Sequence, residues 1–308
     1  MGRDRSGPYN GRVLGEILTA IVTPFHEDGS VDLASFKRLC AHLVEHGSDG
    51  LVVAGTTGES PTLTDAEKLA LFAAAVETVG DRATVIAGTG SNDTAHSVHL
   101  TEQAHALGVH GFLVVTPYYN KPPQRAIVAH FRAIAEATDR PLVAYNIPQR
   151  CVVNIEPETI LELAEIPNVI AVKQATTDLG EARRIVEEAG LDLYAGNDDL
   201  ILPFLELGGV GGVCVFTNLA EVGPRVKELI GLFKAADREG ATAIGRELEP
   251  ILEALAVTTN PIPIKAALAI TGWDVGGLRL PLLEATDDEK ARIRGGLERA
   301  GLLAATRA

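Results

Sequence analysis

One lysine in this sequence directly follows a run of apolar residues. Lys173 comes after the segment NVIAV at residues 168–172, which has the composition of a buried β-strand. A lysine at the end of a buried strand is desolvated, and desolvation disfavours the charged form of an amine. A neutral amine can attack a ketone to form an imine, an electron sink for carbon–carbon bond formation or cleavage. Position alone leaves two alternatives open: pairing with a carboxylate, or extension of the amine into solvent.

A turn with a glycine on each side of two threonines lies between another predicted strand and helix. It has the sequence GTTGES at residues 55–60. The glycines permit a tight turn, so that backbone N–H groups can face inward beside the hydroxyls of Thr56 and Thr57. Such a turn can hold a carboxylate or another small anion. It lacks the Gly-Lys-Ser/Thr of a Walker loop, and a plain connecting turn remains the alternative.

Two other predicted strands are followed by side chains that could move protons or bind charge. Tyr145 closes an aliphatic run, and its phenol can transfer protons if other hydroxyls lie beside it; core filling is the alternative. Arg150, in the following loop, offers a bidentate grip on a carboxylate, or else a structural salt bridge. Tyr118 and Tyr119 form an aromatic pair on a third loop, which is more typical of packing or of an interface.

These side chains belong to a chain in which short apolar runs alternate with longer amphipathic segments. The runs are apolar on both faces, as parallel strands covered by helices require. Eight strand-plus-helix units predict an α/β fold, a (β/α)8 TIM barrel, with an open doubly wound sheet as the alternative. The predicted strands are residues 18–22, 49–53, 84–87, 111–115, 142–145, 169–172, 191–195 and 212–215.

Helical signals separate the strands and continue after the last one. Thr64 and Glu67 have the spacing of a capping box. The strand signal stops after Val215, so we expect residues 13–235 to form the catalytic barrel and 236–308 a C-terminal helical segment packed on it. In such a barrel chemistry takes place at the carboxyl ends of the strands. Helices with defined bounds are predicted at 32–45, 124–138, 157–164, 179–189, 199–207, 241–257, 263–271 and 287–300.

Composition excludes several classes of partner. The formal net charge of −14 argues against nucleic acid or an anionic membrane, and no apolar run approaches the roughly 20 residues that span a bilayer. The eight histidines form no cluster at the predicted strand ends, so no metal site is expected. Cys40, Cys151 and Cys214 are widely spaced, as in proteins of a reducing compartment. We therefore expect a cytoplasmic protein.

Three motifs, in this order along the chain, resemble one enzyme family. They are GTTGES at 55–60, VTPYYNKP at 115–122 and YNIPQR at 145–150. The resemblance extends from TAIVTPF at 19–25 to NPIPIK at 260–265 and LPL at 280–282. On these motifs the chain resembles the pyruvate-dependent class I aldolase family typified by dihydrodipicolinate synthase and N-acetylneuraminate lyase, and is most similar to the dihydrodipicolinate (4-hydroxy-tetrahydrodipicolinate) synthase branch.

The resemblance implies a Schiff-base lyase that needs no cofactor. It would condense pyruvate with aspartate 4-semialdehyde to 4-hydroxy-tetrahydrodipicolinate, a step toward diaminopimelate and lysine. A related aldolase acting on a 2-keto-3-deoxy acid or a similar aldehyde acceptor is the alternative, although Arg150 argues against a neutral sugar aldehyde. A catalytically silent binding protein is the third hypothesis, and it would be expected to lack Lys173 or Tyr145. The implied assembly is a homotetramer, a dimer of dimers.

The resemblance also implies roles for the candidate catalytic residues. Lys173 matches the imine-forming lysine and Tyr145 the tyrosine that moves protons to and from the imine and enol intermediates. Thr57 matches a threonine that relays those protons, with Thr56 beside it in the same turn. Tyr119 matches a tyrosine that reaches into the neighbouring subunit's active site and completes the relay.

Substrate-binding roles are implied for four positions. Thr57 would lie by the pyruvate carboxylate. Arg150 matches the residue that grips the carboxylate of the semialdehyde at the entrance of the site. Gly196 and Val213 match positions whose backbone approaches the substrate near the imine.

Two departures from the family pattern lead to further expectations. Gln174 follows the lysine where many relatives carry an acidic residue, so the surroundings of the lysine are expected to differ. At the family's lysine feedback site the corresponding positions are Asp65, Lys68 and His96. Because Lys68 would repel a cationic effector, we expect weak or absent inhibition by lysine.

Overall fold

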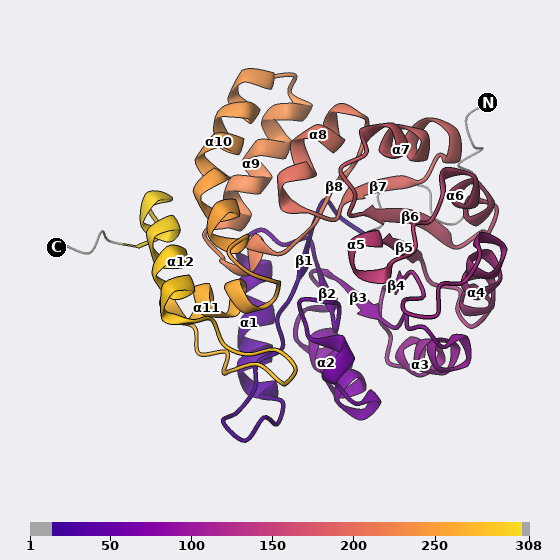
Figure 1. Ribbon diagram of the computed structural model, residues 1–308, viewed down its shortest axis with the longest axis horizontal. Coiled ribbons are helices and arrows are strands. Elements are labelled where there is room, and N and C mark those ends of the chain that lie inside the picture. Colours follow the sequence, from indigo (N-terminus) through magenta and orange to yellow (C-terminus); the bar gives the residue numbers. More distant parts are fainter. Residues whose placement is uncertain (1–13, 304–308) are drawn as a thin grey trace.

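The computed structural model describes residues 14–303, and a closed barrel of parallel strands lies at its centre (Figure 1). Each strand pairs with the next along the chain, and β8 pairs with β1 to close the ring. The predicted (β/α)8 barrel is therefore confirmed and the open sheet excluded. The strands are β1 (Ile17–Ala20), β2 (Gly50–Val53), β3 (Thr84–Gly88), β4 (Gly111–Val115), β5 (Leu142–Asn146), β6 (Val169–Gln174), β7 (Asp192–Ala195) and β8 (Gly211–Cys214).

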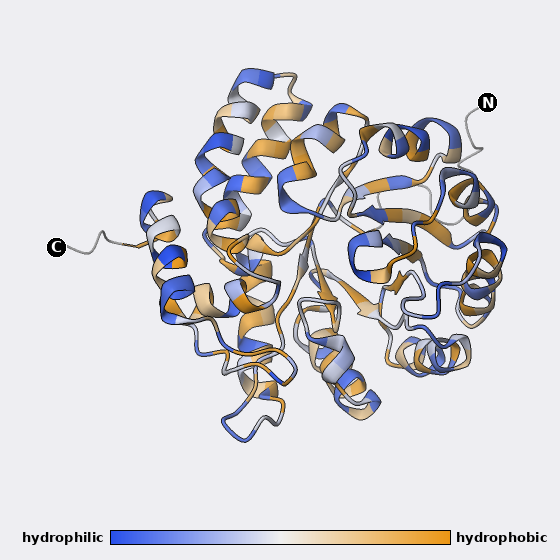
Figure 2. Ribbon diagram, viewed as in Figure 1, coloured by the Kyte–Doolittle hydropathy of each residue, from blue (hydrophilic) through white to orange (hydrophobic). Residues whose placement is uncertain are grey.

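Helices surround the barrel and turn their polar faces outward (Figure 2). Those that follow strands are α1 (Leu33–Glu45), α2 (Asp65–Val79), α3 (Thr94–Ala106), α4 (Gln124–Glu136), α5 (Pro148–Cys151), α6 (Pro157–Ala164), α7 (Leu179–Arg184), α8 (Ile201–Glu206) and α9 (Val222–Lys234). Three more, α10 (Arg238–Leu255), α11 (Ile262–Ile270) and α12 (Asp287–Arg299), gather on one side of the barrel (Figure 1). Among residues 14–303, no helix is long and apolar enough to cross a membrane.

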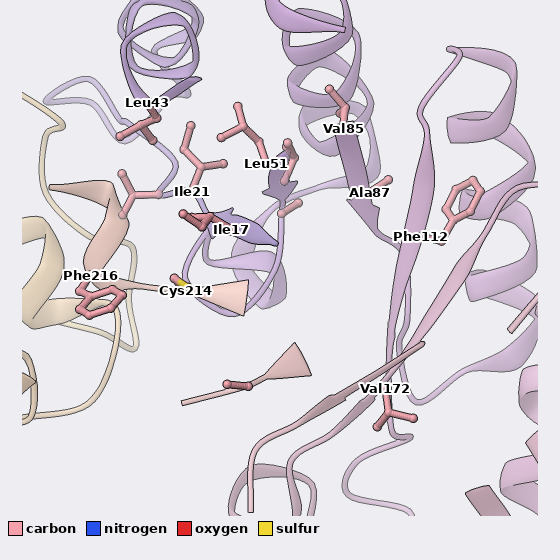
Figure 3. Packing of buried hydrophobic residues seen from close by; sticks show 14 of the residues in the cluster. Ile17, Ile21, Leu43, Leu51, Val85, Ala87, Phe112, Val172, Cys214 and Phe216 are labelled. Atoms are coloured by element: carbon pink, nitrogen blue, oxygen red, sulfur yellow. The ribbon is translucent and has the colours of Figure 1, made fainter. Parts of the chain in front are cut away.

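Alternation along the strands creates two layers of core. The side chains of Ile17 and Cys214 belong to the layer between strands and helices, where Leu43 of α1 also packs (Figure 3). Their neighbours in sequence, Leu18 and Val213, belong to the smaller cluster inside the barrel. Because successive side chains of a strand point to opposite faces, a polar residue near a strand end faces either the interior or the helices.

The C-terminal helices pack directly on the barrel's last helix. Helix α10 contacts α9, and α12 contacts both α10 and α11. The proposed division between residues 13–235 and 236–308 falls in the short connection between α9 and α10, and it remains a prediction, with positions 13 and 304–308 outside the described residues. The three cysteines are buried and free.

The main difference from the predicted elements concerns the strand that carries the lysine. We predicted that this strand ends before Lys173, but β6 continues through it to Gln174. Both residues still pair with β5, Lys173 opposite Tyr145 and Gln174 opposite Asn146. Polar side chains at a buried strand end interrupt the hydropathy pattern without interrupting the backbone ladder. The capping box of Thr64 at the start of α2 is confirmed.

Candidate active site

Lys173 and Tyr145 face each other across β5 and β6 inside the barrel. Lys173 is 5% exposed and Tyr145 4%, and the Lys173 Nζ lies 4.1 Å from the centroid of the Tyr145 ring. Within residues 14–303, no carboxylate lies within ion-pairing distance of this amine. The geometry therefore matches neither alternative, since the amine is buried without an ion pair.

An aspartate that sequence reasoning did not single out ties together the neighbouring strand ends. Asp198, just after β7, accepts hydrogen bonds from the backbone N–H of Val215 (2.9 Å) and of Phe216 (2.8 Å) after β8. Burial raises the pKa of Asp198 to about 6, although these N–H donors and the charge of Lys173 act in the opposite direction. The signal that could have found it is a carboxylate two residues after Gly196 at a strand end.

The threonine turn follows β2 and is held from several sides. Thr57 is 2% exposed, and its Oγ1 accepts a hydrogen bond of 2.9 Å from the Asn260 side-chain amide. Thr23 donates to the Gly58 carbonyl at 2.7 Å. In the described part of the chain, no hydrogen bond joins Thr56 or Thr57 to Tyr145. The structure thus buries Thr57, and the predicted relay between these hydroxyls remains a prediction.

A buried ion pair fixes the end of this turn to the C-terminal segment. Glu59 has a left-handed backbone (φ 58°) and accepts from the Lys265 Nζ at 2.9 Å, with side-chain exposures of 1% and 2%. Lys265 also donates to the Gly277 carbonyl, and the Arg279 backbone N–H donates to the second Glu59 oxygen at 3.1 Å. Burial lowers the pKa of Lys265, while Glu59 raises it. Both residues lie within the family motifs, but their pairing was not predicted.

Arg150 is exposed on the one-turn helix α5, which follows β5. Its Nη2 donates to the Thr259 hydroxyl and to the Asn260 carbonyl, each at 3.2 Å. No carboxylate among the described residues pairs with it, so the structural salt bridge that was the alternative is not formed. A guanidinium held by neutral oxygens keeps its charge available for an anionic ligand.

Gly196 directly follows β7, and Val213 lies on β8. The Gly196 N–H donates to the Gln174 carbonyl at 2.8 Å. A Cβ at Gly196 would lie 2.8 Å from the Ala175 Cβ and from that carbonyl, so no larger residue fits without movement. Val213 is 1% exposed and faces the barrel interior. Val213 therefore borders the interior of the barrel, and Gly196 lies against Ala175, which belongs to the same interior cluster.

Tyr119 is not brought to the other candidates within this chain. Its side chain is 87% exposed, and its backbone is left-handed (φ 72°), a conformation that is uncommon for a residue other than glycine. The Asn120 side chain anchors the loop by donating to the Asn92 carbonyl at 2.9 Å. Tyr118 instead packs against the interior cluster.

Gln174 points away from the lysine, into a network on the outer side of the barrel. Its Oε1 accepts from the Asn146 amide at 3.1 Å, and its Nε2 donates to Glu181 at 3.3 Å. Asn154 donates to the other Glu181 oxygen at 2.8 Å. Burial raises the pKa of Glu181. A carboxylate is thus present in this network, supplied by α7 rather than by position 174.

The three residues of the predicted feedback position lie together. The His96 Nε2 is 2.9 Å from the Asp65 carboxylate, and the Lys68 Nζ is 3.9 Å from it. Lys68 is 8% exposed; burial lowers its pKa, and the Asp65 charge raises it.

Comparison with known proteins places these residues in a wider context. A family model described as the dihydrodipicolinate synthetase family matches residues 13–300. The 4-hydroxy-tetrahydrodipicolinate synthase of Moorella thermoacetica is 51% identical over 94% of this chain and 99% of its own length. That of Symbiobacterium thermophilum is 48% identical over the same shares of the two chains.

Solved structures of dihydrodipicolinate synthases are also similar to this chain. Dihydrodipicolinate synthase from Cyanidioschyzon merolae, solved with lysine bound, superposes with a TM-score of 0.93 at 44% identity, covering 95% of this chain and 100% of the other. A structure described as the first monomeric dihydrodipicolinate synthase variant has a TM-score of 0.90 at 38% identity, covering 94% and 98%.

Proposed function

The chain belongs to the dihydrodipicolinate synthetase family, and on that premise we propose that it is a lyase that condenses pyruvate with aspartate 4-semialdehyde through an imine on Lys173. The product would be 4-hydroxy-tetrahydrodipicolinate, an intermediate of lysine and diaminopimelate biosynthesis. The names of the relatives support the reaction. The observation that carries the mechanism is the buried Lys173 amine, which lies over the Tyr145 ring and has no ion-pair partner among residues 14–303.

The proposed chemistry begins with the Lys173 amine. Its nitrogen attacks the ketone carbon of pyruvate, and water leaves as the C=N bond forms. Loss of a methyl proton then gives an enamine, whose carbon attacks the aldehyde carbon of the second substrate while the aldehyde oxygen takes up a proton. The amino group of that substrate finally attacks the imine carbon, closes the ring and releases Lys173. Tyr145 is proposed to move the protons, with Thr57, Thr56 and Tyr119 as its relay.

The two substrate carboxylates are proposed to bind at two places. The buried Thr57 turn would receive the carboxylate of pyruvate, with the backbone at Gly196 and Val213 bordering the imine. Arg150 would grip the carboxylate of the semialdehyde. The absence of an ion pair at Arg150 within residues 14–303 supports this assignment and argues against a neutral sugar aldehyde as the acceptor.

We also propose a homotetramer built as a dimer of dimers, in the cytoplasm. Tyr119, with its exposed side chain and left-handed backbone, supports a contact between subunits. A strained backbone conformation costs free energy, and an aromatic side chain that stays in solvent does little to offset that cost. Light scattering across a dilution series measures the assembly. If Tyr119 completes a neighbour's site, activity per chain should fall as the assembly dissociates.

Reduction with borohydride in the presence of pyruvate tests the mechanism. Intact mass should show one pyruvate-sized adduct in the wild type and none in Lys173→Ala. Turnover with aspartate 4-semialdehyde, compared with cleavage of 2-keto-3-deoxy acids, then identifies the acceptor. A wild-type chain that forms no adduct with pyruvate would refute the proposal. Faster cleavage of the keto-deoxy acids would replace the acceptor while retaining the imine.

A further inference from the structure

Asn260 is placed between the two proposed carboxylate sites. Its side-chain amide donates to the Thr57 Oγ1 at 2.9 Å, and its backbone carbonyl accepts from Arg150 at 3.2 Å. The residue lies in the loop between α10 and α11, 203 residues from Thr57 in the sequence. It therefore contacts the groups proposed to hold pyruvate and the semialdehyde, although it belongs to neither the turn nor the strands.

The direction of the bond to Thr57 has a chemical consequence. A threonine hydroxyl has one proton and two acceptor positions. Because Thr57 accepts from Asn260, its own proton is left to be donated elsewhere. A carboxylate accepts hydrogen bonds and donates none, so a hydroxyl that binds pyruvate must act as a donor.

We propose that Asn260 is a positioning residue that keeps the Thr57 hydroxyl in the donor role toward the carboxylate of pyruvate. The inference rests on the proposed function and deepens it. It assigns the C-terminal segment a part in capturing the first substrate.

Two further observations support this role. The Asn260 Oδ1 is buried without a hydrogen-bond partner among the described residues. A buried unpaired acceptor costs stability, which a side chain needed only for packing would avoid. In addition, the segment that carries Asn260 is fixed to the same turn by the Lys265–Glu59 ion pair five residues further on, so the amide is held in place relative to Thr57.

The test compares two replacements with the shape of asparagine. Asn260→Asp presents an acceptor, which would draw the Thr57 proton toward itself. Asn260→Leu removes the amide but leaves the hydroxyl free to turn toward the ligand. We measure the pyruvate concentration that gives half-maximal imine, by borohydride trapping and intact mass. It should rise about 100-fold in Asn260→Asp, as for a lost bond to a charged group, and less than about tenfold in Asn260→Leu.

A double-mutant cycle separates the hydroxyl from the added charge. In a Thr57→Val background there is no proton to redirect, so Asn260→Asp should then cost less than about threefold. Thr57→Val alone should weaken capture more than Asn260→Leu alone, a comparison that holds even if Asn260→Asp does not fold. Thr258→Val, two residues away with its hydroxyl on Glu289 of α12, is the matched control and should stay within about twofold of wild type.

Each outcome decides the question. If Asn260→Asp captures pyruvate as well as the wild type does, the proposal is overturned. An acceptor at position 260 would then be harmless, as expected if Thr57 already donates its proton to Asn260 in the wild type. A full penalty of Asn260→Asp in the Thr57→Val background would also overturn the proposal, since charge alone would then explain it. Weaker capture by Asn260→Leu than by Thr57→Val would indicate a packing role. Failure of the wild type to capture pyruvate would refute the proposed function instead.

Discussion

Two buried lysines in this protein both lie beside an aromatic ring, but they differ in their hydrogen-bond and ion-pair partners. The Nζ of Lys173 lies 4.1 Å from the centre of the Tyr145 ring, and that of Lys265 lies 4.3 Å from the centre of the Phe25 ring. Lys265 is also bonded to the Glu59 carboxylate and to a backbone carbonyl. No such partner within residues 14–303 contacts Lys173.

The comparison shows which surroundings let a buried lysine contribute to stability and which let it react with a substrate. A buried ammonium that is paired and hydrogen-bonded is tolerated as part of the fold, and removing its partner is costly. An amine without a partner adds little to stability, but its nitrogen is free to bond to a substrate. We therefore expect replacements at these two positions to affect different properties.

The largest expected effect is on activity, at the unpaired lysine. Lys173→Met should lower turnover by about a thousandfold or more, because the nucleophile is lost. Its free energy of unfolding should stay the same or rise, because methionine fills the same space without a polar group. Steady-state kinetics and urea unfolding measure the two quantities. A large loss of stability would show that Lys173 is structural after all.

The next effect is on stability, at the paired lysine. Lys265→Met should lower the free energy of unfolding by about 3–5 kcal/mol, since Glu59 would remain buried without its counter-charge. Urea unfolding measures this loss. Adding Glu59→Gln to the same variant should restore part of it. If the single variant is as stable as the wild type, the ion pair does not hold the turn as inferred.

The hydroxyl of Tyr145, the tyrosine beside Lys173, should affect mainly the rate of turnover. Tyr145→Phe keeps the ring beneath the amine but removes the hydroxyl. Turnover should fall roughly 100-fold or more, as for loss of a positioned proton donor and acceptor, while imine formation slows but persists. Rapid mixing followed by borohydride trapping compares the two steps. Wild-type turnover in this variant would exclude the proton role.

A buried histidine shows how burial affects a weaker base than lysine. His130 on α4 is 5% exposed and its Nε2 has no hydrogen-bond partner in the described part of the chain. Burial lowers its pKa from 6.5 to about 4, against the charge of Asp93. Between these values the unfolded chain binds the proton and the folded chain does not, so this contribution to stability is lost as the pH falls from 6.5 toward 4.

The size of this loss can be measured by difference. Between pH 7 and pH 5 it should amount to about 2 kcal/mol in the wild type. Urea unfolding of His130→Leu over the same range should lack this component. A parallel pH dependence of the two proteins would indicate that His130 titrates normally in the folded state.

The smallest expected effect concerns a third buried lysine. Lys68 is loosely paired, with its Nζ 3.9 Å from Asp65, and its positive charge disfavours a cationic effector at this place. We expect no half-maximal inhibition by free lysine at about 1 mM, a threshold that corresponds to roughly −4 kcal/mol of binding free energy. An inhibition assay with both substrates near saturation decides this. Inhibition below that concentration would contradict the prediction.

The predictions made from sequence succeeded where the signal is local. Alternating apolar runs predicted all eight strands, and a spacing of three residues predicted the capping box of Thr64 and Glu67. Lys173 was found by its place after an apolar run, although the strand extends through it. Asp198 stands at a predicted strand end, two residues after Gly196, but its role was missed because its partners are backbone N–H groups of another strand end, and no sequence pattern indicates that pairing.

Contacts between distant segments explain the remaining failures. The bonds of Asn260 to Thr57 and of Lys265 to Glu59 join the threonine turn to residues that lie 203 and 206 positions further along the chain, in the loop before α11 and on α11 itself. Neither segment has a sequence pattern that would predict the other as its neighbour. The resemblance to known enzymes included both segments, but it did not indicate that they touch.

The bond between Glu59 and Lys265 also bears on how the enzyme matures during synthesis. The ribosome makes the carboxylate early and its ammonium partner more than two hundred residues later. A nascent chain could therefore assemble much of its barrel while the threonine turn still lacks its counter-charge. The chain would become able to bind substrate only after its final helices have formed. A chain truncated near its C-terminus would therefore have much of the shape of the enzyme but not its activity.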